Sequence, residues 1–436
     1  PTSNPPTPRQ HYDRRRMELG ADSTARELVQ DRNVRRYLFS IASAAIGQNL
    51  LLTVLFKQVF DISGNVLDIG FIGLAQFLPA LLLVLVSGYI ADRFDRRRIS
   101  AIGLFGRGAA TLALVAFSIS GSAAVWKLFA IAAVLGTADA ILVPARRSIA
   151  PFITPIAAFP KVMPLWMGTF TAATIVGPIM GGFLYSLSAS WAYGIAAALQ
   201  FAAITPLLRL HYNREPERNL DRPTWSSAVE GLTFVRRTPI VLSVISLDLF
   251  AVLFGGAVAL IPAVASERLG VGDIAYGWLR AAPGIGAAGM AAVLTFRPVV
   301  RRVGPTLLWV VAVFGAGTVV FGLTRNYAVA FIALIVITAA DMVSMNIRAA
   351  IVPLVTPDHQ LGRVNAVEGV FIGASNELGA FESGVAARAL GLPWAIAGGG
   401  LITVAIAASF ALIFPSLRKI DTYEELTSTE PSPAPI

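Results

Sequence analysis

The sequence contains a succession of apolar runs of about 20 residues, separated by mostly short polar segments. A run of that length is what an α-helix needs to cross the hydrocarbon core of a bilayer. Across the 436 residues, 55% are hydrophobic and only 14% are charged, whereas soluble domains carry about 25% charged residues. The chain is therefore predicted to be an all-α integral membrane protein.

We predict twelve transmembrane spans in two groups of six. They cover residues 37–56, 69–90, 99–120, 124–147, 161–186, 191–210, 239–264, 274–296, 305–323, 327–349, 363–388 and 393–414. The predicted organisation is an N-terminal tail without a cleavable signal peptide, two bundles joined by a central loop, and a C-terminal tail, at 1–36, 37–210, 211–238, 239–414 and 415–436. Within the central loop, residues 225–237 have the pattern of an amphipathic helix that lies on the membrane surface.

The distribution of basic residues predicts the orientation. If both termini face the cytoplasm, 28 of the 35 Lys and Arg residues fall in tails and loops on that side, five at the opposite edges, and two within spans. This asymmetry is what the positive-inside rule requires. We therefore expect a multi-pass protein of a bacterial inner membrane with both termini in the cytoplasm.

An internal repeat supports the division into two groups of six spans. A shift of 202 residues, without a gap, places Asp139 on Asp341, Arg146 on Arg348 and Pro151 on Pro353. Matched charges and prolines are harder to obtain by chance than matched apolar residues. Spans four and five therefore correspond to spans ten and eleven, and the two halves are predicted to be pseudo-symmetric.

The loop after the second span carries the most specific motif, Gly88-x-x-x-Asp92-Arg93-x-x-Arg96-Arg97. Together with twelve spans, a long central loop and a repeat, it resembles the signature loop of the major facilitator superfamily. Several stretches look like the enterobactin-exporter and macrolide-efflux branch of that superfamily. They are 70–98, Ala281-Ala-Pro-Gly-Ile-Gly286, Leu361-Gly-Arg-Val-Asn365 and Asn376-Glu-Leu-Gly-Ala-Phe-Glu-Ser-Gly384.

This resemblance implies two six-helix bundles around a central cavity that works by alternating access. It also implies that the signature loop is a cytoplasmic latch, in which Asp92 meets the start of span eleven and nearby arginines. The chain departs from the sugar and drug–proton branches in span one, which has no acidic residue and offers only Gln48 and Asn49 at mid-depth. A proton site cannot be carried over to that span.

Ionisable residues inside spans normally face a cavity or a partner, because a charge at the bilayer centre is costly. Asp139 and Arg146 lie seven residues apart on one helix face, and Asp341 and Arg348 repeat this spacing. One interpretation is an inner gate, in which these acids pair with arginines of adjoining helices when the cytoplasmic side closes. Static bracing of the bundle and direct substrate contact are the alternatives.

Other charged residues within spans are candidates for coupling or substrate binding. Glu377 is the preferred acid of span eleven, while Glu368 and Glu382 share a different face and Glu368 has Arg363 as a possible plain partner. Asp248 in span seven is either cavity-lining or structural. The candidates for an anionic substrate, against the alternative of packing or snorkelling, are Arg107 and Arg280.

Span five contains Gly177-Pro178-x-x-Gly181-Gly182, which resembles the antiporter signature of exporters in the superfamily, with Ala173 where a leading glycine usually stands. Small residues allow helices to approach closely, and proline removes one backbone hydrogen bond. The motif therefore predicts either a helix pivot or plain packing.

Several classes of function are excluded by what the chain lacks. It has no cysteine, and its three histidines lie in tails or loops. No catalytic set, metal-ligand spacing, phosphate-binding loop or nucleic-acid motif occurs. We therefore expect no enzyme, no cofactor, no bound metal and no nucleic-acid partner.

The sequence predicts a secondary active exporter that moves an amphipathic organic molecule, a siderophore or drug-like compound, with protons as the coupling ion. A monomer in the lipid bilayer is expected. The alternatives are uptake or lipid flipping by the same fold, and a non-transporting membrane scaffold or sensor.

Overall fold

The structure is a computed structural model that describes residues 30–147, 159–211 and 225–427, together with Leu28, Ile149 and Ile153. Within these ranges every regular element is a helix. The first half, here called the N-half, contains α3 (Arg32–Ser63), α4 (Val66–Arg93), α5 (Arg96–Ile119), α6 (Val125–Arg147), α7 (Phe159–Leu187), α8 (Ala189–Ala202) and α9 (Ile204–Leu208).

The second half, here called the C-half, follows a helix of the central loop, α10 (Trp225–Arg237), whose bounds are those predicted from the sequence. It contains α11 (Pro239–Gly255), η3 (Ala257–Leu260), α12 (Ile261–Ala263), η4 (Val264–Arg268), α13 (Asp273–Phe296), α14 (Val303–Leu323), α15 (Tyr327–Val355), α16 (Asp358–Leu390) and α17 (Leu392–Ile413). Two short helices end the described chain, α18 (Pro415–Lys419) and α19 (Glu424–Thr427).

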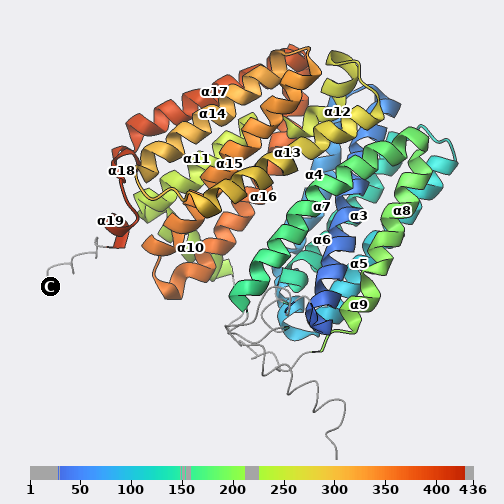
Figure 1. Cartoon of the computed structure of the whole chain (residues 1–436), viewed down its shortest axis with the longest axis horizontal. Coiled ribbons are helices and arrows are strands. Elements are labelled where there is room, and N and C mark those ends of the chain that lie inside the picture. The colour runs from blue at the N-terminus through green and yellow to red at the C-terminus, as the bar shows by residue number, and fades with distance from the viewer. Residues whose placement is uncertain are drawn as a thin grey trace, which may run out of the picture.

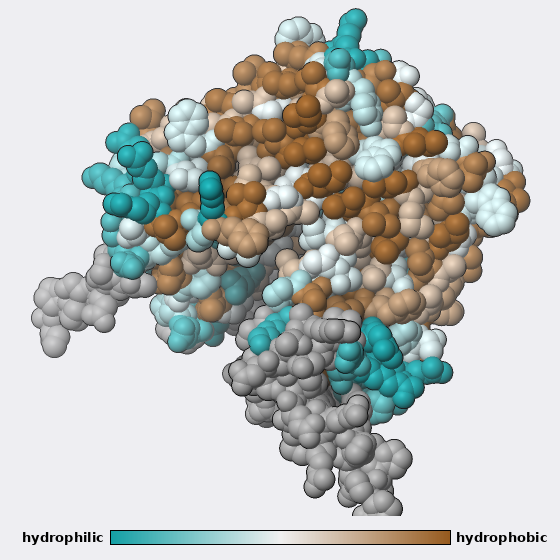
Figure 2. All heavy atoms as spheres, viewed as in Figure 1, coloured by the Kyte–Doolittle hydropathy of each residue, from teal (hydrophilic) through white to brown (hydrophobic). Residues whose placement is uncertain are grey.

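Eleven helical segments of the described chain are long and apolar enough to cross a membrane. The predicted span that is missing from this set is α16, which has 33 residues but carries Glu368, Glu377 and Glu382. Apolar residues dominate the middle of the face seen in Figure 2, and hydrophilic residues gather toward its ends. The fold is thus the predicted bundle of membrane-spanning helices, with one span made more polar by its acids.

The first span begins earlier than predicted. Asp31 caps α3, because its carboxylate accepts hydrogen bonds from the backbone N–H groups of Asn33 and Val34 at 2.8 and 2.9 Å. The helix therefore starts at Arg32, five residues before the predicted start of the span at residue 37. At the other end, Gly64 adopts φ 62° and terminates the helix, a conformation that favours glycine.

The segment predicted as the seventh span, 239–264, lies within one candidate membrane span, Pro239–Arg268, but is not a single regular helix. Regular helix α11 ends at Gly255, and a 3₁₀ turn, a short α-helical turn that contains Pro262 and a π-helical turn carry the chain to Arg268. A Cβ atom at Gly256 would lie 2.6 Å from the Val252 carbonyl oxygen. A side chain would clash there, so glycine stands where the regular helix ends.

The two halves converge at one end of the molecule, the end that carries α12, and diverge toward the end that carries α9 and α10 (Figure 1). We call these the α12 end and the α10 end. Helix α7 packs on α13, and α4 packs on α16, across the boundary between the halves. Figure 2 shows a recess between the halves that opens toward the α10 end.

The hydrophobic core of the described chain also joins the two halves at the α12 end and not at the α10 end. One buried cluster of the C-half includes Phe60 and Ile69 of the N-half together with Leu260 and Tyr276. The buried clusters closer to the α10 end draw their members from one half only. Burial of apolar surface therefore holds the halves together at the α12 end.

Candidate functional site

Buried charged side chains of the N-half meet at mid-depth between three helices. The Arg107 guanidinium on α5, which is 1% exposed, pairs with the Asp139 carboxylate on α6. Gln48 on α3 joins both, because its amide oxygen accepts from Arg107 at 3.2 Å and its amide nitrogen donates to Asp139 at 3.5 Å. The cluster holds one positive and one negative charge, so it is neutral as a unit.

The C-half places its charges at a comparable depth with a different balance. Arg348 on α15 and Asp248 on α11 pair at 2.7 Å, with side chains only 6% and 8% exposed. Asp341, two turns before Arg348 on α15, lines a small cavity together with Asp248, Phe314 and Ser344. In the described chain Asp341 has no ion-pair or hydrogen-bond partner, so this cluster contains one carboxylate in excess.

These ion pairs bear on the prediction that Asp139 and Asp341 pair with arginines of adjoining helices. Asp139 does pair with an arginine of an adjoining helix, but the arginine is Arg107, which the sequence had suggested as a substrate ligand. Arg348 pairs with Asp248, not with its repeat partner Asp341. Arg146 lies seven residues beyond Asp139 on α6, toward the α10 end. The repeat therefore preserves charge positions, whereas the partners differ between the halves.

An ion cluster at the α12 end joins the halves, and sequence reasoning missed it. The buried Lys57 ammonium near the end of α3 pairs with Asp61 one turn on and lies 3.5 Å from the Asp273 carboxylate at the start of α13. Tyr185 of α7 donates to Asp61 at 2.8 Å. The spacing of Lys57 and Asp61 by four residues was the available signal, but it gave no hint of Asp273.

Backbone contacts continue this closure toward the middle of α13. The Tyr276 hydroxyl donates to the Thr53 carbonyl of α3 at 2.8 Å, in buried surroundings. A Cβ atom at Gly182 of α7 would lie 2.6 Å from the Gly277 Cα atom, so glycine is needed for this approach. Within the described chain, every ion pair and hydrogen bond between the halves lies in this region.

The acids of α16 occupy three different environments. Glu377 faces α4, because a Cβ atom at Gly73 would lie 2.8 Å from its Oε2 atom. Glu368 lies closer to the α10 end and does not pair with Arg363, which instead pairs with Glu230 of α10. Glu382 lies toward the α12 end of the helix. Of the three, Glu377 is the acid placed at the boundary between the halves.

Arg280 on α13 is the second arginine within a predicted span. Its guanidinium lies over the Phe56 ring of α3, 5.6 Å from the ring centroid. One terminal nitrogen donates to the Val258 carbonyl of η3 at 3.2 Å. Unlike Arg107 and Arg348, it has no carboxylate within ion-pair distance in the described chain.

The signature loop is only partly described. The backbone of α4 runs through Gly88 and Asp92, but the Asp92 side chain lies outside what the structure describes, so the latch role of Asp92 stays a prediction. Arg93 ends α4 and Arg96 begins α5. Arg97 pairs with Asp95 at 2.8 Å and donates to the Leu210 carbonyl after α9.

Asp95 caps α5 in this loop. Its carboxylate accepts from the Arg97 backbone N–H at 2.9 Å. Partial burial would raise the pKa of Asp95, but the hydrogen bonds and positive charge of Arg97 outweigh burial and lower it. The carboxylate therefore stays ionised and holds the start of α5.

The glycines of span five make close contacts with two helices. A Cβ atom at Gly177 would lie 2.5 Å from the Asn49 Cβ atom, and one at Gly181 would lie 3.2 Å from the Thr53 Cβ atom, both on α3. Asn49 itself donates to the Ala45 carbonyl at 2.9 Å. Helix α7 passes through Pro178 without interruption. A pivot at this motif stays a prediction.

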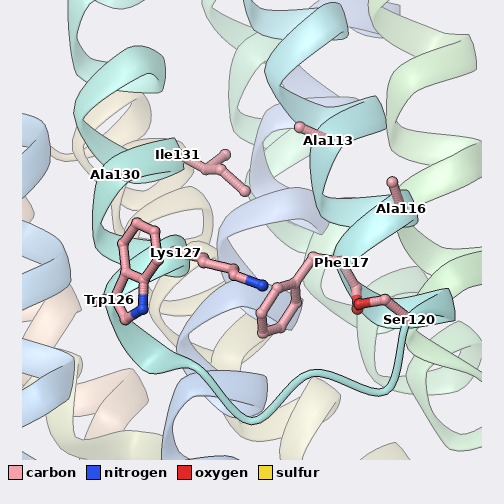
Figure 3. Close-up of a pocket in the computed structure, with 8 residues that line it drawn as sticks. All are labelled: Ala113, Ala116, Phe117, Ser120, Trp126, Lys127, Ala130 and Ile131. Carbon is pink, nitrogen blue, oxygen red and sulfur yellow. The ribbon is translucent and has the colours of Figure 1, made fainter.

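A pocket of about 400 Å³ lies away from these charges. It sits between the adjoining ends of α5 and α6, where Lys127 extends toward Phe117 (Figure 3). Its lining residues are Ala113, Ala116, Phe117, Ser120, Trp126, Lys127, Ala130 and Ile131. Trp126 is 67% exposed, as suits an aromatic residue at a membrane interface. No lining residue comes from the C-half, so this pocket is not a path between the halves.

Comparison with known proteins agrees with this architecture. Residues 37–367 match the model of the Major Facilitator Superfamily. An uncharacterized MFS-type transporter, YfiS, from Bacillus subtilis (strain 168) is 26% identical over 289 residues, which span 64% of this chain and 65% of that protein. The enterobactin exporter EntS of Escherichia coli O1:K1 / APEC is 26% identical over 346 residues, or 76% of this chain and 80% of EntS.

Solved structures show the same fold at lower identity. A bacterial homolog of the human lysosomal transporter Spinster, in an inward-facing and occupied conformation, has a TM-score of 0.65 and 16% identity and covers 87% of this chain and 96% of its own. A D-xylose–proton symporter has a TM-score of 0.67 and 11% identity, with coverage of 86% and 96%. The helices, the two halves and the family match lead to one conclusion: this chain is a multi-pass membrane transporter, not an enzyme, and belongs to the major facilitator superfamily.

Proposed function

We propose that this chain is a proton-coupled exporter of amphipathic organic molecules, siderophores or drug-like compounds, in a bacterial inner membrane. Its α10 end would face the cytoplasm, since the Lys and Arg residues concentrate in the loops of that end. Its similarity to EntS supports export. In this orientation the structure is closed to the outside and open to the cytoplasm.

The observation that carries proton coupling is the unequal charge balance of the two halves. Arg107 and Asp139 neutralise each other, whereas Arg348 pairs with Asp248 and has two further carboxylates within electrostatic reach, Asp341 and Glu368. A buried carboxylate without a cation is stabilised by taking up a proton. Asp341 is therefore the proposed proton carrier, and Asp248 is the acid that keeps Arg348 paired.

Proton uptake at Asp341 also provides a switch. When Asp341 is neutral, Arg348 stays paired with Asp248. When Asp341 is ionised, its carboxylate competes with Asp248 for the Arg348 guanidinium. The preferred arrangement of α11 and α15 therefore depends on protonation, which is how an ion gradient biases two conformations. Glu377, at the boundary between α4 and α16, is the second candidate for this role.

The test is transport into proteoliposomes that contain the purified protein. A panel of siderophores and antibiotics, first screened by accumulation in cells with and without the protein, supplies the substrate. We expect an imposed pH gradient to drive accumulation, and Asp341→Asn to abolish this drive while substrate exchange without a gradient continues. Asp358→Asn, which alters an exposed acid in the first turn of α16, is the matched control.

Three results would each overturn a part of the proposal. If wild-type transport ignored the pH gradient, the protein would not be proton-coupled. If Asp341→Asn stayed fully coupled while Glu377→Gln lost the pH drive, Glu377 would carry the proton in place of Asp341. Accumulation of substrate in cells that hold the protein, in place of depletion, would indicate uptake and contradict export.

A further inference from the structure

We propose that Arg280 is the binding site for an anionic group on the transported molecule, so that the substrate class is aromatic or otherwise apolar organic anions. This inference rests on the proposed export function and names the substrate that the same path would take. It starts from the fact that Arg280 is the intramembrane arginine without a carboxylate partner within 4 Å in the described chain.

The position of Arg280 is set by a row of contacts along α13. Asp273, Tyr276 and Arg280 follow each other at spacings of three and four residues, which places them on one helix face. Asp273 reaches Lys57, Tyr276 reaches the Thr53 carbonyl, and Arg280 lies over Phe56, all on α3. Arg280 is thus the member of this row that lies farthest from the α12 end, on the side that opens toward the α10 end.

The hydrogen bonding of Arg280 is incomplete. Arginine has five N–H donors in a planar fork that suits two oxygens of a carboxylate. In the described chain one terminal nitrogen donates to Val258, and the buried Nε atom has no acceptor. A buried donor without an acceptor is unusual in folded proteins, and an anion at this position would supply the missing oxygens.

Charge compensation from nearby acids does not replace such an anion. The acids on the α12 side of Arg280 belong to the Lys57 cluster, where Asp61 and Asp273 share one ammonium. Asp273 precedes Arg280 by seven residues, which is about 10 Å along a helix. That separation is far beyond contact distance, so the guanidinium keeps its own capacity to bind an anion.

The surroundings also select the rest of the ligand. Phe56 presents its ring to the guanidinium, so an apolar aromatic surface lies beside the positive charge. The Arg280 side chain is neither fully buried nor fully exposed. These features fit a molecule with an acidic group on an aromatic or apolar body.

The experiment measures binding at equilibrium by purified protein in detergent, with two probes that differ only in charge, 2-naphthoate and its neutral amide. We expect wild-type protein to bind naphthoate at least fivefold more tightly than the amide. Arg280→Gln should remove this preference, and Arg280→Lys should retain part of it. Arg325→Gln, which alters an exposed arginine at the α12 end, should bind both probes as wild type does.

The proposal is overturned if wild-type protein binds the two probes equally, or if folded Arg280→Gln keeps the preference for naphthoate. Thermal unfolding and size-exclusion profiles show whether each variant is folded, and Arg280→Met, which also removes the charge, serves if Arg280→Gln is not folded. Because this assay uses no gradient, it separates the two proposals. If wild-type protein showed no preference for naphthoate, proton-driven export of neutral or cationic compounds would still stand. If a pH gradient did not drive transport, anion binding at Arg280 would still stand.

Discussion

The Lys57 ammonium of α3 lies 3.5 Å from the Asp273 carboxylate of α13, and this contact is the ion pair that joins the two halves in the described chain. Lys57 is buried, and Asp61 and Tyr185 complete its surroundings. A buried pair loses more when one partner is removed than an exposed pair does. The closure at the α12 end therefore depends on these two residues.

Asp273→Asn is expected to shift the protein toward a state that is open at the α12 end. The chain has no cysteine, so a spin-label pair placed at the exposed positions Ser186 and Glu267 reports this opening directly. The distance distribution should gain a longer component in the variant. Asp68→Asn, which changes an acid in the first turn of α4, controls for loss of a helix-terminal charge, and an equal shift there would contradict the assignment.

Asp139→Asn is expected to destabilise the N-half, because it leaves the nearly inaccessible Arg107 guanidinium without its counter-charge. Removal of one partner of a buried pair costs about 3–5 kcal/mol. The double variant Arg107→Gln/Asp139→Asn should unfold at a higher temperature than Asp139→Asn alone. Thermal unfolding in detergent provides the measurement.

Asp341→Asn is expected to affect thermal stability differently from Asp139→Asn. It removes a carboxylate that has no ion-pair partner in the described chain, so stability should be unchanged or increased. A loss of stability as large as that of Asp139→Asn would mean that Asp341 is a structural charge and not an exchangeable one.

The sequence predicted the fold because the length of an apolar run already decides whether a helix can span a bilayer. It did not show that the helix begins before the first span, since the arginines of 32–36 look like a tail although Asp31 caps a helix there. It also gave no sign that regular helix ends at Gly255, because residues 239–255 are apolar all round and carry no periodicity that would mark a break; the Gly255-Gly256 pair was the available signal. The local sequence pattern therefore predicts that a helix is present, but not the residues at which it begins and ends.

The candidate site was predictable only as a set of charges. Asp139, Asp248, Arg107 and Arg348 are conspicuous because they interrupt apolar runs. Which acid meets which arginine depends on how the helices pack, and no spacing along the chain encodes the Arg107–Asp139 or Asp248–Arg348 contacts. Lys57 was overlooked because a lysine at the edge of a span normally faces water.

Gly182→Ala is expected to weaken closure at the α12 end, because the added methyl group would overlap the Gly277 backbone of α13. Two backbones cannot yield as a flexible side chain does, so the helices must separate. The Ser186–Glu267 distance should increase. Gly168→Ala on the same helix, where no atom lies within 4 Å, should only gain the about 1 kcal/mol helix preference of alanine, and an unchanged distance in both variants would refute the contact.

Asp95→Ala is expected to lower thermal stability by about 1 kcal/mol through loss of the α5 cap, while Asp95→Asn should retain much of it because an amide oxygen also accepts the Arg97 N–H bond. Since the pKa of Asp95 is lowered in the folded protein, its charge contributes stability above the unfolded value and loses that contribution as pH falls. The difference between wild type and Asp95→Asn should therefore be constant near neutrality and shrink below about pH 4. A difference that instead grew on acidification would contradict the lowered pKa.

The crossing of α7 and α13 brings two glycines face to face, so no side chains interlock at that point. Where side chains of two helices interlock, they must change rotamers before the helices separate. Two helices that meet through glycine backbone can separate without such a change. The Gly182–Gly277 crossing thus favours rapid interconversion between conformations. It should therefore affect the turnover number more than the affinity for the substrate.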